Sequence, residues 1–428
     1  MSLNITYVIK KEHRMKKILT LAFMFYFVLA EDEFFEPGVN IGGYGEMHYE
    51  NSVNPDSDAD PSTKLDFHRW IMFLNYNWTP EWSLKSELEI EHNMIGGSYG
   101  GYVELEQAYI NYHNAEGNWG FGTGTMLISA GIINETHEPP TFLSVERPSY
   151  NKYIIPTTWF GNGAMAYGSF GDFYAKFVLH EDMNGLGMVD EGSFDGLRKG
   201  RAKGYKSTAY HWTKNMSMHW TGMEGLNIGG SYSFGGAPTG LNTYVMNDDG
   251  DYEAEEVHGS KDYVDWNLME MHAQYDANDI IFAFEYGTSS FSHVADNMHN
   301  VIVPHIVGVD DSMNCGDDEM ASCNDEIIRV EGSYSELLVE DATSAGYYFH
   351  LGYNVGSLLG LENCKLVPWF GVESYDVNDS GPDKPIAHTK MGVTWWPTDK
   401  VSFKMDYDMK DNNDSKKNTL SLGVGYMF

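Results

Sequence analysis

Apolar and polar residues alternate with a period of two along most of the chain after residue 38. The clearest segment has apolar residues at Trp82, Leu84, Leu88 and Ile90 and charged residues at Lys85, Glu87, Glu89 and Glu91. The last segment alternates in the same way up to the terminal Phe428. This period is typical of a β-strand with one apolar face and one solvated face.

The segments between these alternating runs fall into two classes. Short turns flanked by aromatic residues occur at 78–82, 114–119, 171–173, 276–279 and 395–399, and longer loops rich in Gly and Asp lie between them. A membrane barrel has short turns on one side, long loops on the other and aromatic residues at the interfaces. A closed barrel also pairs all its backbone groups inside lipid. The pattern therefore favours an all-β transmembrane antiparallel barrel over a soluble sandwich.

Sixteen strands are predicted by this reading. They cover approximately residues 39–50, 64–78, 82–94, 101–113, 117–128, 161–170, 173–182, 204–221, 225–234, 262–275, 280–291, 345–355, 363–375, 385–397, 400–410 and 418–428. A further weak candidate, 327–338, would place the chain ends on opposite sides of the membrane and is assigned to an outer loop over 292–345. A hairpin hidden in that loop would raise the count to eighteen. Sixteen tilted strands enclose a lumen wide enough for water.

The N-terminal 30 residues have the pattern of an export signal. Lys16 and Lys17 precede an apolar stretch from Ile18 to Ala30, which is too short to cross about 30 Å of hydrocarbon as a helix. A basic segment, an apolar segment and small residues at its end are typical of a cleaved signal peptide. We expect residues 1–30 to be removed, with Met15 as a possible true start, and 31–428 to form the barrel. A buried N-terminal helix is the alternative.

Composition and charge exclude several classes of protein. The chain has 62 acidic and 27 basic residues, a formal charge of -35, and a mean hydropathy of -0.39. It is too polar for a bundle of membrane-spanning helices. Nucleic acid is not expected as a partner, because nucleic-acid-binding proteins need a basic surface.

A family resemblance becomes specific between residues 104 and 168. The run from Glu104 to Tyr112 leads through one hairpin into a long loop that carries Asn134, Glu135, Glu138, Glu146, Arg147 and Lys152. This region resembles the phosphate-selective porin O/P family of Gram-negative outer membranes, and weaker similarity covers nearly all of residues 31–428.

The resemblance implies an integral outer-membrane barrel of sixteen strands, usually trimeric, in contact with lipid and lipopolysaccharide. It implies that the third outer loop, about 129–160, folds into the lumen as the constriction, with Arg147 and Lys152 as its basic members. It also implies that Phe428 resembles the signal read by the outer-membrane assembly machinery.

The charges on the predicted lumen wall depart from that family. Phosphate selectivity there depends on Lys and Arg, whereas the lumen-facing candidates here are Glu87, Glu89, Glu91, Glu104 and Glu106. Carboxylates on a low-dielectric wall attract cations and repel phosphate. A basic strip on the opposite wall could include Arg69, Arg147, Lys152, Lys176, Arg198 and Arg201.

The sequence therefore predicts a water-filled channel for passive diffusion of ions and small hydrophilic solutes, general or cation-preferring. An anion- or phosphate-selective porin is one alternative, and a surface receptor or adhesin, suggested by the loop at 292–345, is another. Catalysis is not expected. A plugged, energy-coupled transporter is disfavoured because few residues precede the first strand.

The sequence gives only weak evidence for a metal site. Asp56, Asp58 and Asp60 follow Asn54 at the spacing that opens a calcium loop, but the Gly and the Glu that would complete the loop are missing. A second acidic group lies over 248–256. We expect solvated loops and no cofactor, with occasional loop-bound Ca²⁺ or Mg²⁺ as the alternative. The 16 His residues are scattered and predict no zinc site.

The sequence contains two further motifs. Cys315 and Cys323 lie in a loop expected to face an oxidising compartment, so a local disulfide is predicted, while Cys364 has no evident partner. Residues 96–100 match GxSxG, but no helix is predicted after them, so they are not a nucleophile elbow.

Overall fold

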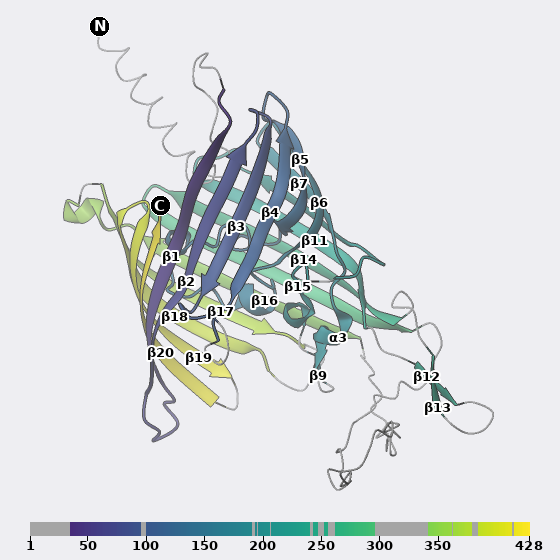
Figure 1. The fold of residues 1–428 in the computed structure, drawn as a ribbon. Coiled ribbons are helices and arrows are strands. Elements are labelled where there is room, and N and C mark those ends of the chain that lie inside the picture. Colours follow the sequence, from purple (N-terminus) through teal and green to yellow (C-terminus); the bar gives the residue numbers. More distant parts are fainter. Residues whose placement is uncertain are drawn as a thin grey trace, which may run out of the picture.

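The computed structural model describes residues 35–95, 100–190, 193–194, 196–205, 207–239, 243–246, 252–255, 262–295, 341–361, 363–378, 384–412 and 415–428. These residues form a closed antiparallel barrel of sixteen strands, in which each strand pairs with its neighbours along the chain (Figure 1). The predicted fold class and the predicted count of sixteen are both confirmed.

The barrel strands are β1 (Gly38–Val53), β2 (Ser62–Asn77), β3 (Trp82–Glu91), β4 (Val103–His113), β5 (Trp119–Leu127), β6 (Phe160–Phe170), β7 (Phe173–His180), β10 (Thr213–Trp220), β11 (Leu226–Pro238), β14 (Asp262–Ala277), β15 (Ile280–Ala295), β16 (Ala342–Tyr353), β17 (Lys365–Asp376), β18 (Ile386–Thr398), β19 (Val401–Asn412) and β20 (Ser415–Met427).

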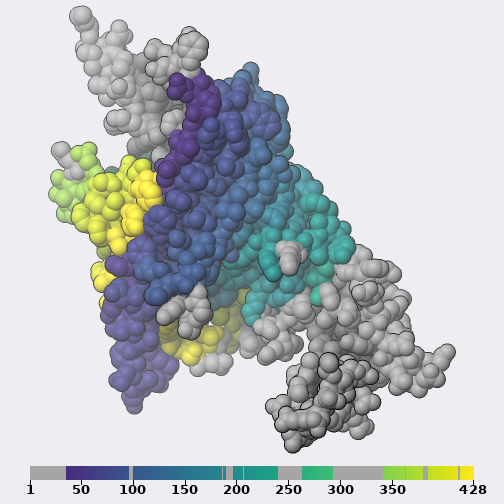
Figure 2. Space-filling view, viewed as in Figure 1, coloured from purple at the N-terminus to yellow at the C-terminus, as the bar shows by residue number. Residues whose placement is uncertain are grey.

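The last strand closes the barrel against the first. β1 and β20 pair from Tyr44 opposite Met427 to Val53 opposite Asn418. Phe428 donates its backbone N–H to the Gly43 carbonyl. The yellow surface of the last strands accordingly meets the purple surface of β1 in Figure 2. Closure leaves no free strand edge, which is the condition for a sheet in lipid.

Alternation along each strand separates an apolar outer face from a polar inner face. Large apolar side chains that stay exposed on the strands include Ile41, Leu74, Leu105, Phe121, Phe177, Met218, Met271, Leu351, Phe370, Met405 and Leu422. Aromatic rings gather near the short turns, where Trp82 and Tyr112 lie 5.0 Å apart and Phe170 and Phe173 lie 5.6 Å apart. An apolar outer belt with aromatic residues at its edge is the surface of a membrane barrel.

The connections on the other side of the barrel are longer and carry the remaining elements. Two small two-stranded sheets pair β8 (Val189–Asp190) with β9 (Ser193–Phe194) and β12 (Thr243–Met246) with β13 (Tyr252–Glu255). The short helices are η1 (Pro139–Thr141), α2 (Tyr150–Tyr153), α3 (Gly185–Met188) and η2 (Leu197–Gly200), while η3 (Ser357–Leu359) lies in the turn after β16. None of the helices in the described ranges has the length and apolar character needed to cross a bilayer.

One predicted strand was substantially wrong at its start. A strand is predicted over 204–221, but β10 covers only Thr213–Trp220. The residues just before it turn away because the backbone N–H groups of Tyr210, His211 and Trp212 donate to the Asp182 carboxylate instead of a strand. The other strand ends differ from the prediction by a few residues.

Several predictions lie outside the described residues. These are the signal peptide at 1–30, the weak strand at 327–338, the Cys315–Cys323 disulfide, the first four residues (96–99) of the GxSxG match and most of the acidic group at 248–256.

Candidate constriction site in the barrel lumen

Residues 128–159, between β5 and β6, form a loop that folds into the barrel; we call it the constriction loop. Its two ends are held together at Asn134. The Asn134 Nδ2 group donates to the carbonyls of Ile128 (2.7 Å) and Trp159 (2.8 Å), and the Trp159 N–H donates to Asn134 Oδ1 (2.7 Å). Asn134 therefore shapes the loop and is buried, with 0% of its surface exposed.

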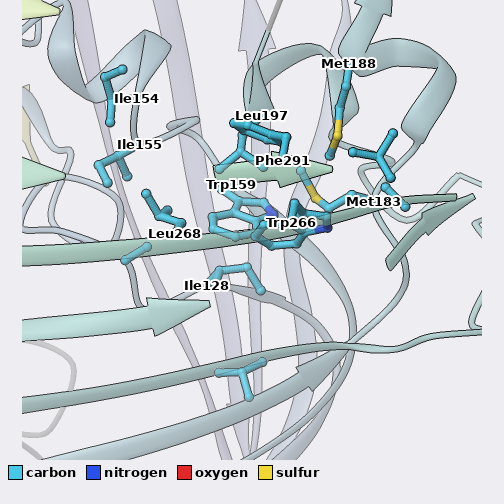
Figure 3. Close-up of a cluster of buried hydrophobic side chains, with 14 of the residues drawn as sticks. Ile128, Ile154, Ile155, Trp159, Met183, Met188, Leu197, Trp266, Leu268 and Phe291 are labelled. Atoms are coloured by element: carbon cyan, nitrogen blue, oxygen red, sulfur yellow. The ribbon is translucent and has the colours of Figure 1, made fainter. Parts of the chain in front are cut away.

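An apolar core fixes one side of the loop to the barrel wall. Ile128, Ile154, Ile155 and Trp159 pack with Trp266 and Leu268 of β14, Phe291 of β15, and Met183, Met188 and Leu197 of the next outer connection (Figure 3). The Trp159 and Trp266 rings lie 6.0 Å apart. Full burial of such side chains contributes about 1.5–3 kcal/mol each, so the loop is a packed part of the structure.

Polar contacts anchor the loop to other strands around the lumen. They join Ser129 to Asn215 of β10, Gly131 to Glu270 of β14, Ile132 to Glu285 of β15, Ser149 to Glu373 of β17, Leu143 to Thr394 of β18, and Val145 to Asp406 of β19. Lys404 of β19 also donates to the Ser144 carbonyl. The loop thus crosses the lumen from wall to wall, as the sequence predicted for the third outer loop.

Five carboxylates on β3 and β4 form an acidic wall: Glu87, Glu89, Glu91, Glu104 and Glu106. All five side chains point inward, but the constriction loop covers the deeper ones. Glu87, Glu89 and Glu106 are only 2%, 4% and 1% exposed. Glu91 and Glu104 lie near the outer strand ends and are half-buried. Glu104 pairs with Lys203 at 2.6 Å, a residue that the sequence analysis did not single out.

A β-bulge brings extra polar groups to this wall. The register between β3 and β4 shifts after Glu87, which pairs with Gln107, so that Leu88 pairs with Leu105. Glu106 is the additional residue, and both Glu106 and Gln107 are buried on the inner side. Bulges re-aim side chains in this way.

Arg69 of β2 is an internal counter-ion next to the acidic wall. Its Nε donates to Glu46 at 2.5 Å, and its other nitrogens reach Tyr44 Oη (3.4 Å) and the His137 carbonyl (2.9 Å). Arg69 is 1% exposed and Glu46 is 3% exposed. Arg69 is therefore fully committed to this network and is not part of a basic strip facing water.

Four other cations do come together, on the outer side of the constriction loop; we call Arg147, Lys152, Arg198 and Arg201 the basic cluster. Arg198 donates to the carbonyls of Lys152 and Thr157, and Arg201 donates to those of Pro156 and Thr158. Arg147 donates to Thr158 Oγ1. No ion pair joins these four to a carboxylate within the described part of the chain.

Positive charges within the basic cluster lower the pKa values of Lys152, Arg198 and Arg201, in addition to the effect of burial. Burial, followed by the charges of Arg198 and Arg147, lowers the pKa of Lys152. Burial and the charge of Arg147 lower the pKa of Arg198, and burial and Arg198 lower that of Arg201. Lys152 remains exposed and the three Arg residues are partly exposed, so this site faces water and presents hydrogen-bond donors.

Two further predicted residues of the loop, Glu135 and Glu146, pair with basic side chains of the barrel wall. Glu135 accepts from Lys176 at 2.6 Å, and although burial opposes its charge, Lys176 lowers its pKa. Glu146 lies 2.6 Å from His48 Nδ1, and this contact lowers its pKa against the effect of burial. Glu138 precedes η1 and is half-buried. Lys176 therefore does not belong to the basic cluster.

The weaker candidates lie elsewhere. Asp56, Asp58 and Asp60 are exposed in the first outer loop, with Asp56 Oδ2 3.9 Å from Lys416 Nζ. Cys364 lies in the turn between β16 and β17 and forms no disulfide with a described residue. Sequence reasoning missed the wall carboxylates Glu285, Glu373 and Asp406, although their inward positions on alternating strands could have identified them.

Comparison with known proteins gives one relative and several similar folds. No protein-family model matches the chain. A protein of Aquifex aeolicus (strain VF5), described as "Uncharacterized protein", is 31% identical over 407 residues, covering 91% of this chain and 80% of that protein. The chain belongs to the same family as this Aquifex protein.

The solved structures are similar in fold. The outer membrane channel DcaP of Acinetobacter baumannii aligns with a TM-score of 0.52 at 10% identity, covering 92% of this chain and 97% of that chain. The trimer form of OmpT from Vibrio cholerae aligns with a TM-score of 0.51 at 11% identity over 92% and 99% of the chains. OmpF of Salmonella typhi, in complex with daunomycin, aligns with a TM-score of 0.50 at 11% identity, covering 91% of this chain and 97% of that chain. The barrel thus has the fold of outer-membrane porins and channels.

Proposed function

We propose that this protein is an outer-membrane porin that lets ions and small hydrophilic solutes diffuse through a narrowed, water-filled lumen. The observation that carries the proposal is the constriction loop, which enters a sixteen-stranded barrel and is hydrogen-bonded to the wall on several sides. A loop inside a barrel whose outer face suits lipid narrows a passage without closing the membrane-facing surface. No chemical step is part of this function.

A general or cation-preferring pore is the first form of the proposal. The formal charge of -35 and the acidic wall support it, because a negative lumen concentrates cations. Glu91 and Glu104 are the members of that wall with the most access to water.

An anion-preferring pore is the second form, and one observation favours it. The basic cluster faces water on the outer side of the constriction loop, while the constriction loop covers Glu87, Glu89 and Glu106. Arg side chains suit phosphate and carboxylate groups. This form agrees with the sequence resemblance to the phosphate-selective porin O/P family over residues 104–168.

The assembly and its partners are also proposals. The resemblance and the trimer form of the Vibrio cholerae protein support a homotrimer. The exposed apolar belt supports contact with outer-membrane lipid and lipopolysaccharide. Phe428 is 50% exposed and its ring lies 6.3 Å from that of Trp70, so an aromatic C-terminus is available to the assembly machinery.

The test is planar-bilayer conductance of the purified protein under a tenfold KCl gradient, repeated with added phosphate. Stepwise conductance supports the porin, and the sign of the reversal potential separates its two forms. Block of chloride current by phosphate supports the anion form. Folded protein without any conductance would contradict the porin and favour a surface receptor or adhesin.

A further inference from the structure

Three groups that bind metals in other proteins meet beneath the constriction loop. Glu87 of β3, Glu106 of β4 and His137 of the loop place one ligand atom each within 4.8 Å of one another. His137 Nε2 lies 3.4 Å from Glu106 Oε2 and 3.7 Å from Glu87 Oε1. The three residues are 2%, 1% and 2% exposed, so water does not screen their charges.

The orientation of His137 makes this meeting unfavourable without a cation. His137 Nδ1 lies 3.2 Å from the Asn134 carbonyl oxygen, which makes Nδ1 the donor nitrogen. In the neutral imidazole, Nε2 then carries a lone pair that points at the two carboxylates. Glu106 Oε2 and His137 Nε2 have no hydrogen-bond partner among the described residues. Buried polar atoms of this kind need a partner, and a bound cation would supply one.

The surrounding groups hold Glu87 and His137 in place without neutralising the carboxylates. Gln107 donates to Glu87 Oε2 at 2.5 Å, and Tyr44 donates to Glu87 Oε1 at 3.3 Å. Arg69 gives its donors to Glu46, Tyr44 and the His137 carbonyl. Hydrogen bonds that orient the ligands are the usual second layer of a metal site.

We propose that Glu87, Glu106 and His137 bind a divalent transition-metal ion of the zinc type. One imidazole nitrogen and two carboxylate oxygens suit Zn²⁺, whereas Mg²⁺ and Ca²⁺ prefer oxygen alone. Tetrahedral ligands at 2.0–2.1 Å from zinc lie about 3.3 Å apart, close to the observed 3.4 Å and 3.7 Å. Glu89, which is 4% exposed, lies in a second group with Glu104 and Glu106, and it or a water molecule would complete the coordination.

The ion would tie the constriction loop to the acidic wall and cancel two of its negative charges. This assignment does not depend on whether the barrel conducts ions, because it concerns binding alone. A bound cation also explains how the negatively charged carboxylates of Glu87 and Glu106 can be buried next to each other.

A competing cluster lies at the outer rim. Asp66, His68 and His92 also bring three ligand atoms together. There, however, Lys64 Nζ lies 3.0 Å from Asp66 Oδ2 and already supplies a positive charge. This cluster therefore serves as a control site.

The experiment is a Zn²⁺ titration of the full-length protein in detergent, after chelator treatment, with a competing chromophoric chelator. The wild type is expected to bind one tight equivalent. Glu106→Gln and His137→Gln are each expected to weaken binding by about 100-fold or more. Glu373→Gln, a buried wall carboxylate that contacts the same loop, and His92→Gln at the rim should leave this equivalent unchanged.

A second measurement covers the case in which a variant does not fold. X-ray absorption of the Zn²⁺-loaded wild type should give one imidazole with oxygen ligands for the rest. Two imidazoles per zinc would assign the metal to a cluster with two histidines, and loss of the tight equivalent only in His92→Gln would assign it to the rim; either result would overturn the proposal. The absence of a tight equivalent in the wild type would also overturn it.

Discussion

The acidic wall and the basic cluster differ in their access to water more than in their number of charges. The sequence holds more than twice as many acidic as basic residues, yet the deep carboxylates Glu87, Glu89 and Glu106 lie under the constriction loop. The basic cluster lies on the outer side of that loop, with Lys152 exposed. The constriction loop, and not the overall composition, therefore determines which of these charges water reaches.

The largest difference between the two regions should appear in stability. Arg69→Met removes the guanidinium that faces the buried Glu46 and leaves that carboxylate with His48 Nε2, 3.0 Å away. We expect a loss of about 3–5 kcal/mol in the free energy of unfolding, a factor of about one hundred to several thousand in the folding equilibrium. Lys152→Met, at an exposed position, should change it by less than about 0.5 kcal/mol. Urea unfolding in lipid vesicles, followed by Trp fluorescence, measures both. Equal losses would show that Arg69 and Lys152 sit in similar surroundings.

Removing the constriction loop should give the acidic wall the same access to water that the basic cluster has in the intact barrel. We expect replacement of residues 135–158 by three glycines to be tolerated by the backbone, because Asn134 Oδ1 and the Trp159 N–H are already 2.7 Å apart. Single-channel conductance should rise several-fold, and cation preference should increase as the acidic wall meets water. Unchanged conductance in a folded variant would mean that the passage does not run past this loop.

Neutralising the open charges should change selectivity. Arg147→Gln with Lys152→Gln should move the potassium-to-chloride permeability ratio toward potassium by about three- to tenfold, because the field in a narrow passage is local. Lys64→Gln, which removes an exposed cation at the rim, is the matched control and should have little effect. A similar shift in both variants would indicate a general charge effect.

Neutralising the covered charges should have the smallest effect. Glu87→Gln with Glu89→Gln should alter the permeability ratio by less than about twofold, because the loop separates these carboxylates from water. The reversal potential measures this change as well. A three- to tenfold shift of the permeability ratio toward chloride would contradict this expectation. It would place the acidic wall on the ion path.

The barrel could be predicted from the sequence because its signals are local. The period of two in residues such as Leu84 to Glu91 assigns a strand and its faces at once, and the short aromatic turns set the order of the strands. The start of β10 could not be predicted, because Asp182 binds backbone groups about thirty residues away.

The site could be predicted only in part. The constriction loop and its residues are implied by the family resemblance, and the inward direction of the wall glutamates follows from the alternation of apolar and polar residues. Their coverage depends on tertiary contacts such as Val145 with Asp406, 261 residues apart. The basic cluster combines two loops, and the bulge at Glu106 leaves no mark in the sequence.

Coverage of the acidic wall by the constriction loop can be measured directly as the reactivity of two introduced thiols in a background lacking Cys315, Cys323 and Cys364. Glu89→Cys and Lys152→Cys would be treated with a water-soluble thiosulfonate in the folded barrel. Lys152→Cys should react on the order of 100-fold faster, because Glu89 is covered by the loop, and Glu89→Cys should become reactive when the loop is deleted. Equal rates in the intact barrel would contradict the claim that the loop hides the acidic wall.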